Sequence, residues 1–131
     1  MDLSNYTILV VDDEPDSLTF IGAVLRDSGA TVVEARNGDE ALELARSERP
    51  DMVTLDISMP GKDGAEAFEE MRSDPALKSI PVCIVSGRPE LRRLIYQRTV
   101  PPPDGYVDKP IDEQRLLLNV RKILSLSRRA S

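Results

Sequence analysis

Short apolar segments alternate with longer amphipathic ones along the whole chain, and this alternation constrains the fold more than any other feature. The apolar segments are rich in Val, Ile and Leu, which is typical of strands that are buried on both faces of a sheet. Between them, apolar residues recur every three or four positions, as they do in helices that cover a sheet. The predicted strands are residues 8–11, 31–35, 52–55, 81–85 and 105–107.

Strands that alternate with helices indicate a parallel sheet with helices on both faces. We therefore expect an α/β protein with the flavodoxin-like (βα)5 fold, a doubly wound five-stranded parallel sheet of strand order 2-1-3-4-5. A length of 131 residues suits one domain. Because no repeat, linker or low-complexity tract divides the sequence, residues 1–131 are predicted to form a single domain, with no output domain after the last helix.

Charge and composition exclude several kinds of function. The net charge of −6 argues against direct binding to nucleic acid or to an anionic membrane surface. The absence of histidine leaves carboxylates, Lys, Ser and Tyr to carry any chemistry. Cys83 is the single cysteine and is expected to be an inert core residue. No segment has the roughly 20 apolar residues that span a bilayer, and no signal peptide is recognisable, so we expect a cytoplasmic protein.

Three aspartates are expected to meet at one edge of the predicted sheet. The strand order 2-1-3-4-5 reverses between the first and third strands, and such sheets bind ligands at the carboxyl ends of these strands. Asp12 and Asp13 follow the first strand, and Asp56 follows the third. One such acid alone is usually a helix cap, whereas three at the same switch point indicate a ligand site. Glu14 is adjacent to them and is expected to point elsewhere.

A cluster of this kind suits a hard divalent cation. Two carboxylates about 4 Å apart repel each other by about 4 kcal/mol at an effective dielectric constant near 20, and a cation relieves that repulsion. Oxygen ligands favour Mg²⁺, with Mn²⁺ as a substitute, over zinc. We expect direct ligands from Asp13 and Asp56, and from Asp12 either directly or through water. The backbone carbonyl of Ser58 is a further candidate ligand.

Two more polar side chains are expected at the same edge. Ser86 ends the fourth strand, and Lys109 follows the fifth. A carboxylate flanked by a dication, an ammonium and a hydroxyl is arranged for phosphoryl transfer, because the cations neutralise the phosphoryl oxygens and the hydroxyl bonds one of them. Asp56 would then be the nucleophile.

These residues lie in motifs that together resemble the receiver domain of response regulators in two-component signalling. The resemblance extends over essentially the whole chain, in order and with spacings like those of the family. The motifs are residues 8–15 with Asp12-Asp13-Glu14-Pro15, residues 51–64 with Asp56 and Met59-Pro60-Gly61, Ser86-Gly87, and Tyr106 with Lys109-Pro110.

The resemblance implies a role for each of these residues. Asp56 is then the phosphoacceptor, and Asp12 and Asp13 hold Mg²⁺. Lys109 contacts the phosphoryl group, and the Lys109-Pro110 peptide is cis, which directs the lysine into the site. Ser86 is the switch hydroxyl, and Tyr106 is the aromatic ring that changes rotamer with it. The donor is the phosphohistidine of a histidine kinase or a histidine phosphotransfer protein, and acetyl phosphate should also react. The domain is not a turnover enzyme, although it catalyses its own phosphorylation and slow autodephosphorylation.

Three features depart from the family pattern. Position 86 is Ser where Thr is also common, so the hydroxyl is kept and a methyl group is lost. Gly87 should loosen the loop that follows. Pro101–Pro103 should stiffen the connection before the fifth strand. That connection lies on the face formed by the fourth helix, the fifth strand and the fifth helix. A homodimer formed through this face is an alternative that the sequence leaves open.

The predicted fourth helix is basic within an acidic protein. A solvated face is the favoured interpretation, and a docking site for an acidic partner is the alternative. The basic residues are Arg88, Arg92, Arg93 and Arg98.

Two other functions stay open on the sequence. A metal-dependent phosphatase with an aspartyl nucleophile needs a second acid two residues after Asp56, where this chain has Ser58. A degenerate receiver would bind partners without phosphorylation, but every residue needed for transfer is present here. The sequence also leaves open whether the chain acts alone or within a longer protein such as a hybrid kinase.

Overall fold

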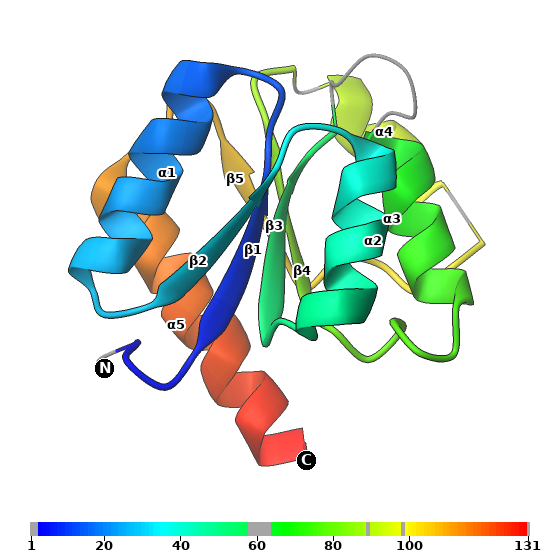
Figure 1. Cartoon of the computed structure of the whole chain (residues 1–131). Coiled ribbons are helices and arrows are strands. Elements are labelled where there is room, and N and C mark those ends of the chain that lie inside the picture. The colour runs from blue at the N-terminus through cyan, green and yellow to red at the C-terminus, as the bar shows by residue number, and fades with distance from the viewer. Residues whose placement is uncertain (1–2, 58–63, 89, 98, 131) are drawn as a thin grey trace.

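The computed structural model describes residues 3–57, 64–88, 90–97 and 99–130. In this part of the chain five parallel strands form one sheet in the order β2-β1-β3-β4-β5, and helices cover both of its faces (Figure 1). The predicted flavodoxin-like fold is therefore confirmed. The strands are β1 (Thr7–Val11), β2 (Thr31–Ala35), β3 (Met52–Asp56), β4 (Val82–Ser86) and β5 (Gly105–Asp108), and the helices are α1 (Pro15–Asp27), α2 (Gly38–Glu48), α3 (Gly64–Ser73), α4 (Glu90–Tyr96) and α5 (Glu113–Ala130).

Two apolar layers hold the sheet between its helices. Successive residues of a strand point to opposite faces, so Leu9 packs with Phe68 of α3 on one face. Val10 packs with Leu25 of α1 and Leu116 of α5 on the other face. Removal of these aliphatic side chains from water, at roughly 25 cal/mol per Å² of apolar surface, is the main source of stability. Strands β3 and β4 are buried along their whole length, as their nearly continuous apolar sequences predict.

The single cysteine lies in the second of these layers. Cys83 is fully buried in β4, and burial raises the pKa of its thiol to about 12. A thiol must lose its proton to act as a nucleophile or as a metal ligand. Cys83 is therefore an inert core residue, as predicted.

The register of the sheet brings the predicted site residues to one edge. Val11 pairs with Leu55, Asp56 with Val85, and Ser86 with Asp108. Asp12 and Lys109 follow the ends of β1 and β5 directly. All of these positions therefore lie within one or two residues of the same carboxyl edge, where the chain leaves the sheet.

Helix α1 begins beside this edge with an unusual cap. Its N-cap residue is Glu14, which is held in an extended conformation before Pro15 and makes no side-chain capping hydrogen bond. Helix α2 is different, because the side chain of Asn37 accepts a hydrogen bond of 2.8 Å from the backbone N–H of Glu40. The carboxylate of Glu14 is thus available for a contact outside its own helix.

Arg72 of α3 ties together the connections that lead into β4 and β5. Its side chain is buried and forms an ion pair of 2.6 Å with Asp104. It also donates hydrogen bonds to the carbonyls of Ile80 (3.0 Å) and Pro102 (3.1 Å). The Asp104 carboxylate in turn accepts a hydrogen bond of 2.8 Å from the backbone N–H of Val82. The proline-rich connection before β5 is therefore fixed by a buried arginine as well as by its own prolines.

Helix α5 is the longest of the described helices and closes the fold. It has 18 residues and packs against the sheet beside α1 (Figure 1). Leu118 and Leu126 on its outer side are exposed. None of the described helices, α5 included, has the length and apolar character needed to cross a membrane.

Candidate functional site

The three aspartates predicted to cluster are brought together at the carboxyl edge of the sheet. One carboxylate oxygen from each of Asp12, Asp13 and Asp56 lies within 4.8 Å of the other two. Asp12 and Asp56 are buried, with 1% exposed surface each, and Asp13 is exposed. The cluster is thus closed on the side of the sheet and open to solvent at Asp13.

Burial and mutual repulsion disfavour the charged forms of these acids. Burial is the largest cause that raises the pKa of Asp12 to about 6, and the charge of Asp56 adds to it, although hydrogen bonds from Glu14 and Lys109 act in the opposite direction. The pKa of Asp13 is also raised, by burial first and then by the charge of Asp56. A site that makes carboxylates costly to ionise gains from a bound cation. Oxygen donors with one open side fit a hard dication such as Mg²⁺.

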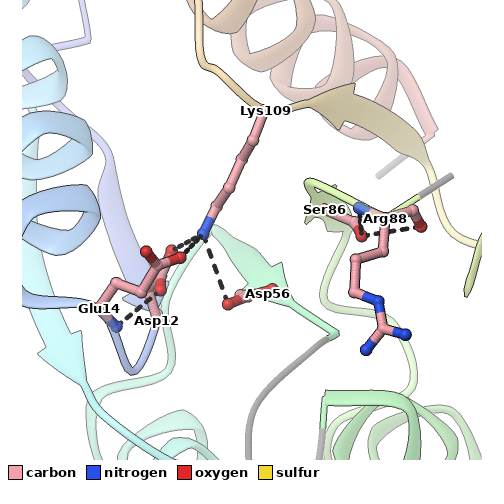
Figure 2. A network of polar contacts seen from close by, with 6 residues as sticks. All are labelled: Asp12, Glu14, Asp56, Ser86, Arg88 and Lys109. Atoms are coloured by element: carbon pink, nitrogen blue, oxygen red, sulfur yellow. Dashed lines mark hydrogen bonds and ion pairs between the residues drawn. The ribbon is translucent and has the colours of Figure 1, made fainter.

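Lys109 projects into this cluster from the residue that follows β5 (Figure 2). Its Nζ lies 3.0 Å from Oδ2 of Asp12 and 3.5 Å from Oδ2 of Asp56. Burial lowers the pKa of Lys109, but hydrogen bonds to Glu14 and Asp12 and the charge of Asp56 outweigh burial and raise the pKa above its ordinary value. The ammonium is therefore charged at any physiological pH. The Lys109-Pro110 peptide is cis, as the family resemblance implies.

Glu14 also belongs to the site, and the expectation that it points elsewhere is wrong. Its Oε1 lies 2.7 Å from Nζ of Lys109, which is the shortest of the three carboxylate contacts of this lysine. Its backbone N–H donates a hydrogen bond of 2.9 Å to Oδ1 of Asp12. Figure 2 shows Glu14 and Asp12 on the same side of Lys109. The sequence holds one signal for this, since Glu is not among the residues preferred at an N-cap position.

Ser86 ends β4 at the same edge, but its hydroxyl is engaged locally. Its Oγ accepts a hydrogen bond of 3.0 Å from the backbone N–H of Arg88 and donates one of 3.2 Å to the Arg88 carbonyl. Figure 2 shows this pair apart from the contacts of Lys109. Because a hydroxyl has one proton, Ser86 has to release the Arg88 carbonyl before it can donate to another oxygen.

Tyr106 lies in β5 and packs on the apolar layer that faces α3 and α4. Its ring lies under the guanidinium of Arg92, 3.7 Å from the ring centroid. The predicted partner of Ser86 is thus in contact with α4. The remaining candidate, the carbonyl of Ser58, lies outside the described residues, so its role as a metal ligand stays a prediction.

The surface beside Lys109 is hollowed. A depression of about 260 Å³ is lined by α1 and by the segment that follows β5. Phe20 of α1 lines it, and its ring is 43% exposed. Periodicity does not predict this surface, because a large apolar residue in an amphipathic helix is expected to face the core. The other lining residues are Asp16, Ser17, Lys109, Pro110 and Ile111.

Known proteins are similar to this chain in sequence and in fold. Residues 8–121 match the family described as response regulator receiver domain. Protein PilH of Pseudomonas aeruginosa is 36% identical over 90% of this chain and 97% of PilH. The sensor protein GacS of Pseudomonas syringae is 34% identical over 93% of this chain, which corresponds to 14% of GacS.

A solved structure of a receiver domain has the same fold as this chain. The signal receiver domain of a signal transduction histidine kinase from Syntrophus aciditrophicus superposes with a TM-score of 0.81 at 28% identity, covering 92% of this chain and 90% of that one. Similar domains therefore occur both as nearly whole proteins and as small parts of larger sensors. Sequence, fold and the clustered acids agree. The chain belongs to the response regulator receiver domain family, whose members are phosphoacceptors that take a phosphoryl group from histidine kinases in two-component signalling systems.

Proposed function

We propose that Asp56 is the phosphoacceptor of this receiver domain, and that residues 1–131 form one such domain. The observation that carries the proposal is the convergence of Asp12, Asp13 and Asp56 with the ammonium of Lys109 at the switch point of the sheet. Asp56 has the position required of the nucleophile. It ends β3, and its carboxylate lies within 4.8 Å of those of Asp12 and Asp13 and 3.5 Å from the ammonium of Lys109.

The cofactor in this proposal is Mg²⁺, for which Mn²⁺ can substitute. Asp12, Asp13 and Asp56 would hold it, with the backbone carbonyl of Ser58 as a further ligand. When bound, the cation removes the repulsion among the carboxylates and neutralises charge on the phosphoryl oxygens.

The residues of the chain then carry the transfer. A carboxylate oxygen of Asp56 attacks the phosphorus of the partner's phosphohistidine, the P–N bond breaks, and the imidazole leaves with the bonding electron pair and takes a proton from solvent. Lys109 leaves its carboxylate partners and donates to a phosphoryl oxygen. The Ser86 hydroxyl releases the carbonyl of Arg88 and donates a hydrogen bond to another phosphoryl oxygen. Tyr106 follows Ser86, and because its ring contacts Arg92, the change reaches α4.

The product is an acyl phosphate on Asp56, which water hydrolyses to restore the carboxylate. Slow autodephosphorylation of this kind makes the domain a signalling switch and not a turnover enzyme. The phosphodonor is a histidine kinase or a histidine phosphotransfer protein. The exposed ring of Phe20 on α1 supports an approach of the partner protein over that helix, whereas acetyl phosphate needs no such docking.

Three further predictions go with this function. A homodimer, where one forms, would use the face of α4, β5 and α5; Leu118 of α5 is 67% exposed. The net charge of −6 disfavours direct binding to nucleic acid. We expect the protein to act in the cytoplasm, where its kinase partner holds the phosphohistidine.

The experiment that tests the proposal is labelling with acetyl phosphate, or with a phosphorylated histidine kinase, in the presence of Mg²⁺. Intact-mass measurements should show one phosphoryl group per chain, stable to acid and labile to alkali. Asp56→Asn should take up none, whereas Asp27→Asn, which alters an exposed aspartate at the end of α1, should label like wild type.

Two outcomes would contradict this assignment. Equal labelling of wild type and Asp56→Asn would show that another residue is the acceptor. Absence of labelling in the wild type, together with no Mg²⁺-dependent response to the phosphoryl mimic beryllofluoride, would show a receiver that acts without phosphorylation.

A further inference from the structure

Lys109 makes its closest carboxylate contact with a residue outside the predicted metal cluster. Its Nζ lies 2.7 Å from Glu14, 3.0 Å from Asp12 and 3.5 Å from Asp56. Glu14 and Lys109 are 95 residues apart in the sequence, so this contact depends on the tertiary fold. The ammonium is therefore bound most closely to an acid that takes no part in the predicted transfer.

The position of Glu14 explains why its side chain is free to make this contact. It is the N-cap residue of α1, but the carboxylate makes no capping hydrogen bond. Its backbone N–H is bound to Oδ1 of Asp12, which fixes the residue beside the cluster. The side chain of Glu14 is 61% exposed, whereas that of Lys109 is 15% exposed. An exposed carboxylate thus contacts a lysine that is itself largely buried.

We infer that Glu14 is a positioning residue that competes with the phosphoryl group for the ammonium of Lys109 and so slows phosphorylation of Asp56. The inference rests on the function proposed above, in which Lys109 donates to a phosphoryl oxygen. An ammonium has three donors and no acceptor, and in the present arrangement its contacts are with carboxylates. A phosphoryl oxygen at Asp56 therefore has to compete with these carboxylates, of which Glu14 is the closest, for a donor of Lys109. The two anions therefore compete for one cation.

The size of the effect follows from the exposure of the pair. Contacts between a lysine and a solvent-accessible carboxylate change an equilibrium by only a small factor, because water and salt screen them. Loss of the Glu14 contact should therefore accelerate phosphorylation about two- to fivefold. The acceleration should shrink at high ionic strength, where the contact is already weak.

The test compares Glu14→Gln, which keeps the shape and removes the charge, with the matched control Asp16→Asn. Asp16 is an exposed acid in the first turn of the same helix. Within the described part of the chain, Lys109 is ion-paired with Glu14, Asp12 and Asp56 and not with Asp16. Both variants remove one negative charge near the site, so a general effect of charge on an anionic donor should appear in both.

The measurements are the rate of acetyl phosphate labelling by intact mass and the apparent affinity for beryllofluoride by ¹⁹F NMR, both at saturating Mg²⁺. Glu14→Gln should label about two- to fivefold faster and bind beryllofluoride correspondingly tighter, while Asp16→Asn stays close to wild type. In a Lys109→Gln background the Glu14→Gln change should have no effect on either quantity, because the cation for which the two anions compete is gone.

The inference is overturned if Glu14→Gln labels no faster than wild type, if Asp16→Asn is accelerated to the same degree, or if the acceleration persists without Lys109. These results differ from a failure of the proposed function. If wild type takes up no phosphoryl group, or Asp56→Asn takes up as much, both proposals fall. Normal labelling on Asp56 with an unchanged rate in Glu14→Gln rejects the role of Glu14 alone.

Discussion

The guanidinium carbon of Arg92 lies 3.7 Å from the centroid of the Tyr106 ring, so a cation–π contact joins α4 to β5. The same guanidinium is 3.9 Å from the carboxylate of Asp108. The basic face of α4 was interpreted from the sequence as solvated, and Arg92 is indeed half exposed. Its contact nevertheless covers the ring that is predicted to follow Ser86. A rotamer change at Tyr106 therefore has to break this contact or move α4 with it.

The hydroxyl of Tyr106 gives a prediction about stability. It is buried and has no hydrogen-bond partner among the described residues. Tyr106→Phe removes this unsatisfied group and keeps the ring under Arg92, so we expect the free energy of unfolding in urea to stay unchanged or to rise by up to about 1 kcal/mol. Tyr106→Ala, which also removes the ring, should lose about 2 to 4 kcal/mol. A loss of more than about 1 kcal/mol in Tyr106→Phe would show that the hydroxyl is bonded after all.

Gly64 gives a second prediction, because it lies against the backbone that carries Asp56. A Cβ at this position would be 2.7 Å from the carbonyl carbon of Asp56 and closer still to its oxygen and to Cα of Ile57. Gly64→Ala has to displace the end of β3, so we expect a loss of about 2 to 3 kcal/mol in urea unfolding and slower labelling of Asp56. The control is Gly87→Ala, whose Cβ would meet Lys109 Cβ at 3.5 Å, an ordinary contact. Equal stability of the two variants would contradict this account.

Arg72 and Asp104 give a third prediction. Arg72 is 5% exposed at its side chain and holds Asp104 and two backbone carbonyls. Arg72→Met should lower the free energy of unfolding by about 2 to 3 kcal/mol, less than a fully enclosed pair would lose, because Asp104 is partly exposed. Arg46→Met breaks the exposed pair with Asp74 and should lower the free energy of unfolding much less, because water screens that pair. Similar losses in the two variants would mean that the buried network adds nothing.

The fold and the placement of the acids could be predicted from the sequence because they follow from periodicity. Alternation of apolar strands and amphipathic helices determines the class of fold. The switch-point rule then places Asp12, Asp13 and Asp56 at one edge without knowledge of any side-chain conformation. The cis Lys109-Pro110 peptide came from the family resemblance and not from this argument.

The contacts of individual side chains could not be predicted in the same way. Glu14 was expected to point elsewhere, but its partner Lys109 is 95 residues away and reaches it only in the folded chain. The role of Ser86 at the site stays a prediction, and its hydrogen bonds with the backbone of Arg88, two residues later, could not be predicted from periodicity. Periodicity determines which face a residue occupies. It does not determine which of several nearby polar groups the side chain then contacts. That depends on distances that only tertiary packing sets.

Asp12 gives a prediction for the dependence of stability on pH. Its pKa is about 6 in the folded protein against an ordinary value of 3.8, so the folded state binds a proton more readily than the unfolded state. The charged carboxylate therefore destabilises the metal-free protein above about pH 6, and this cost disappears as the pH falls towards 4. In EDTA near pH 7.5, Asp12→Asn should be more stable than wild type by on the order of 2 kcal/mol, and the difference should vanish near pH 4. A less stable variant near pH 7.5 would show that the Lys109 contact outweighs burial.

The same pKa predicts how Mg²⁺ binding depends on pH. A protonated carboxylate has to lose its proton before it can bind a dication, so the affinity should fall below about pH 6 and approach a tenfold loss per pH unit. Calorimetric titrations in buffers of different ionisation enthalpy should detect release of one proton near pH 5 and none near pH 8. Asp12→Asn should bind Mg²⁺ more weakly, and its affinity should depend less on pH in this range. If the wild-type affinity for Mg²⁺ is constant between about pH 5 and 7, Asp12 is ionised throughout this range. Burial of Asp12 would then not be the reason why the site gains from a bound cation.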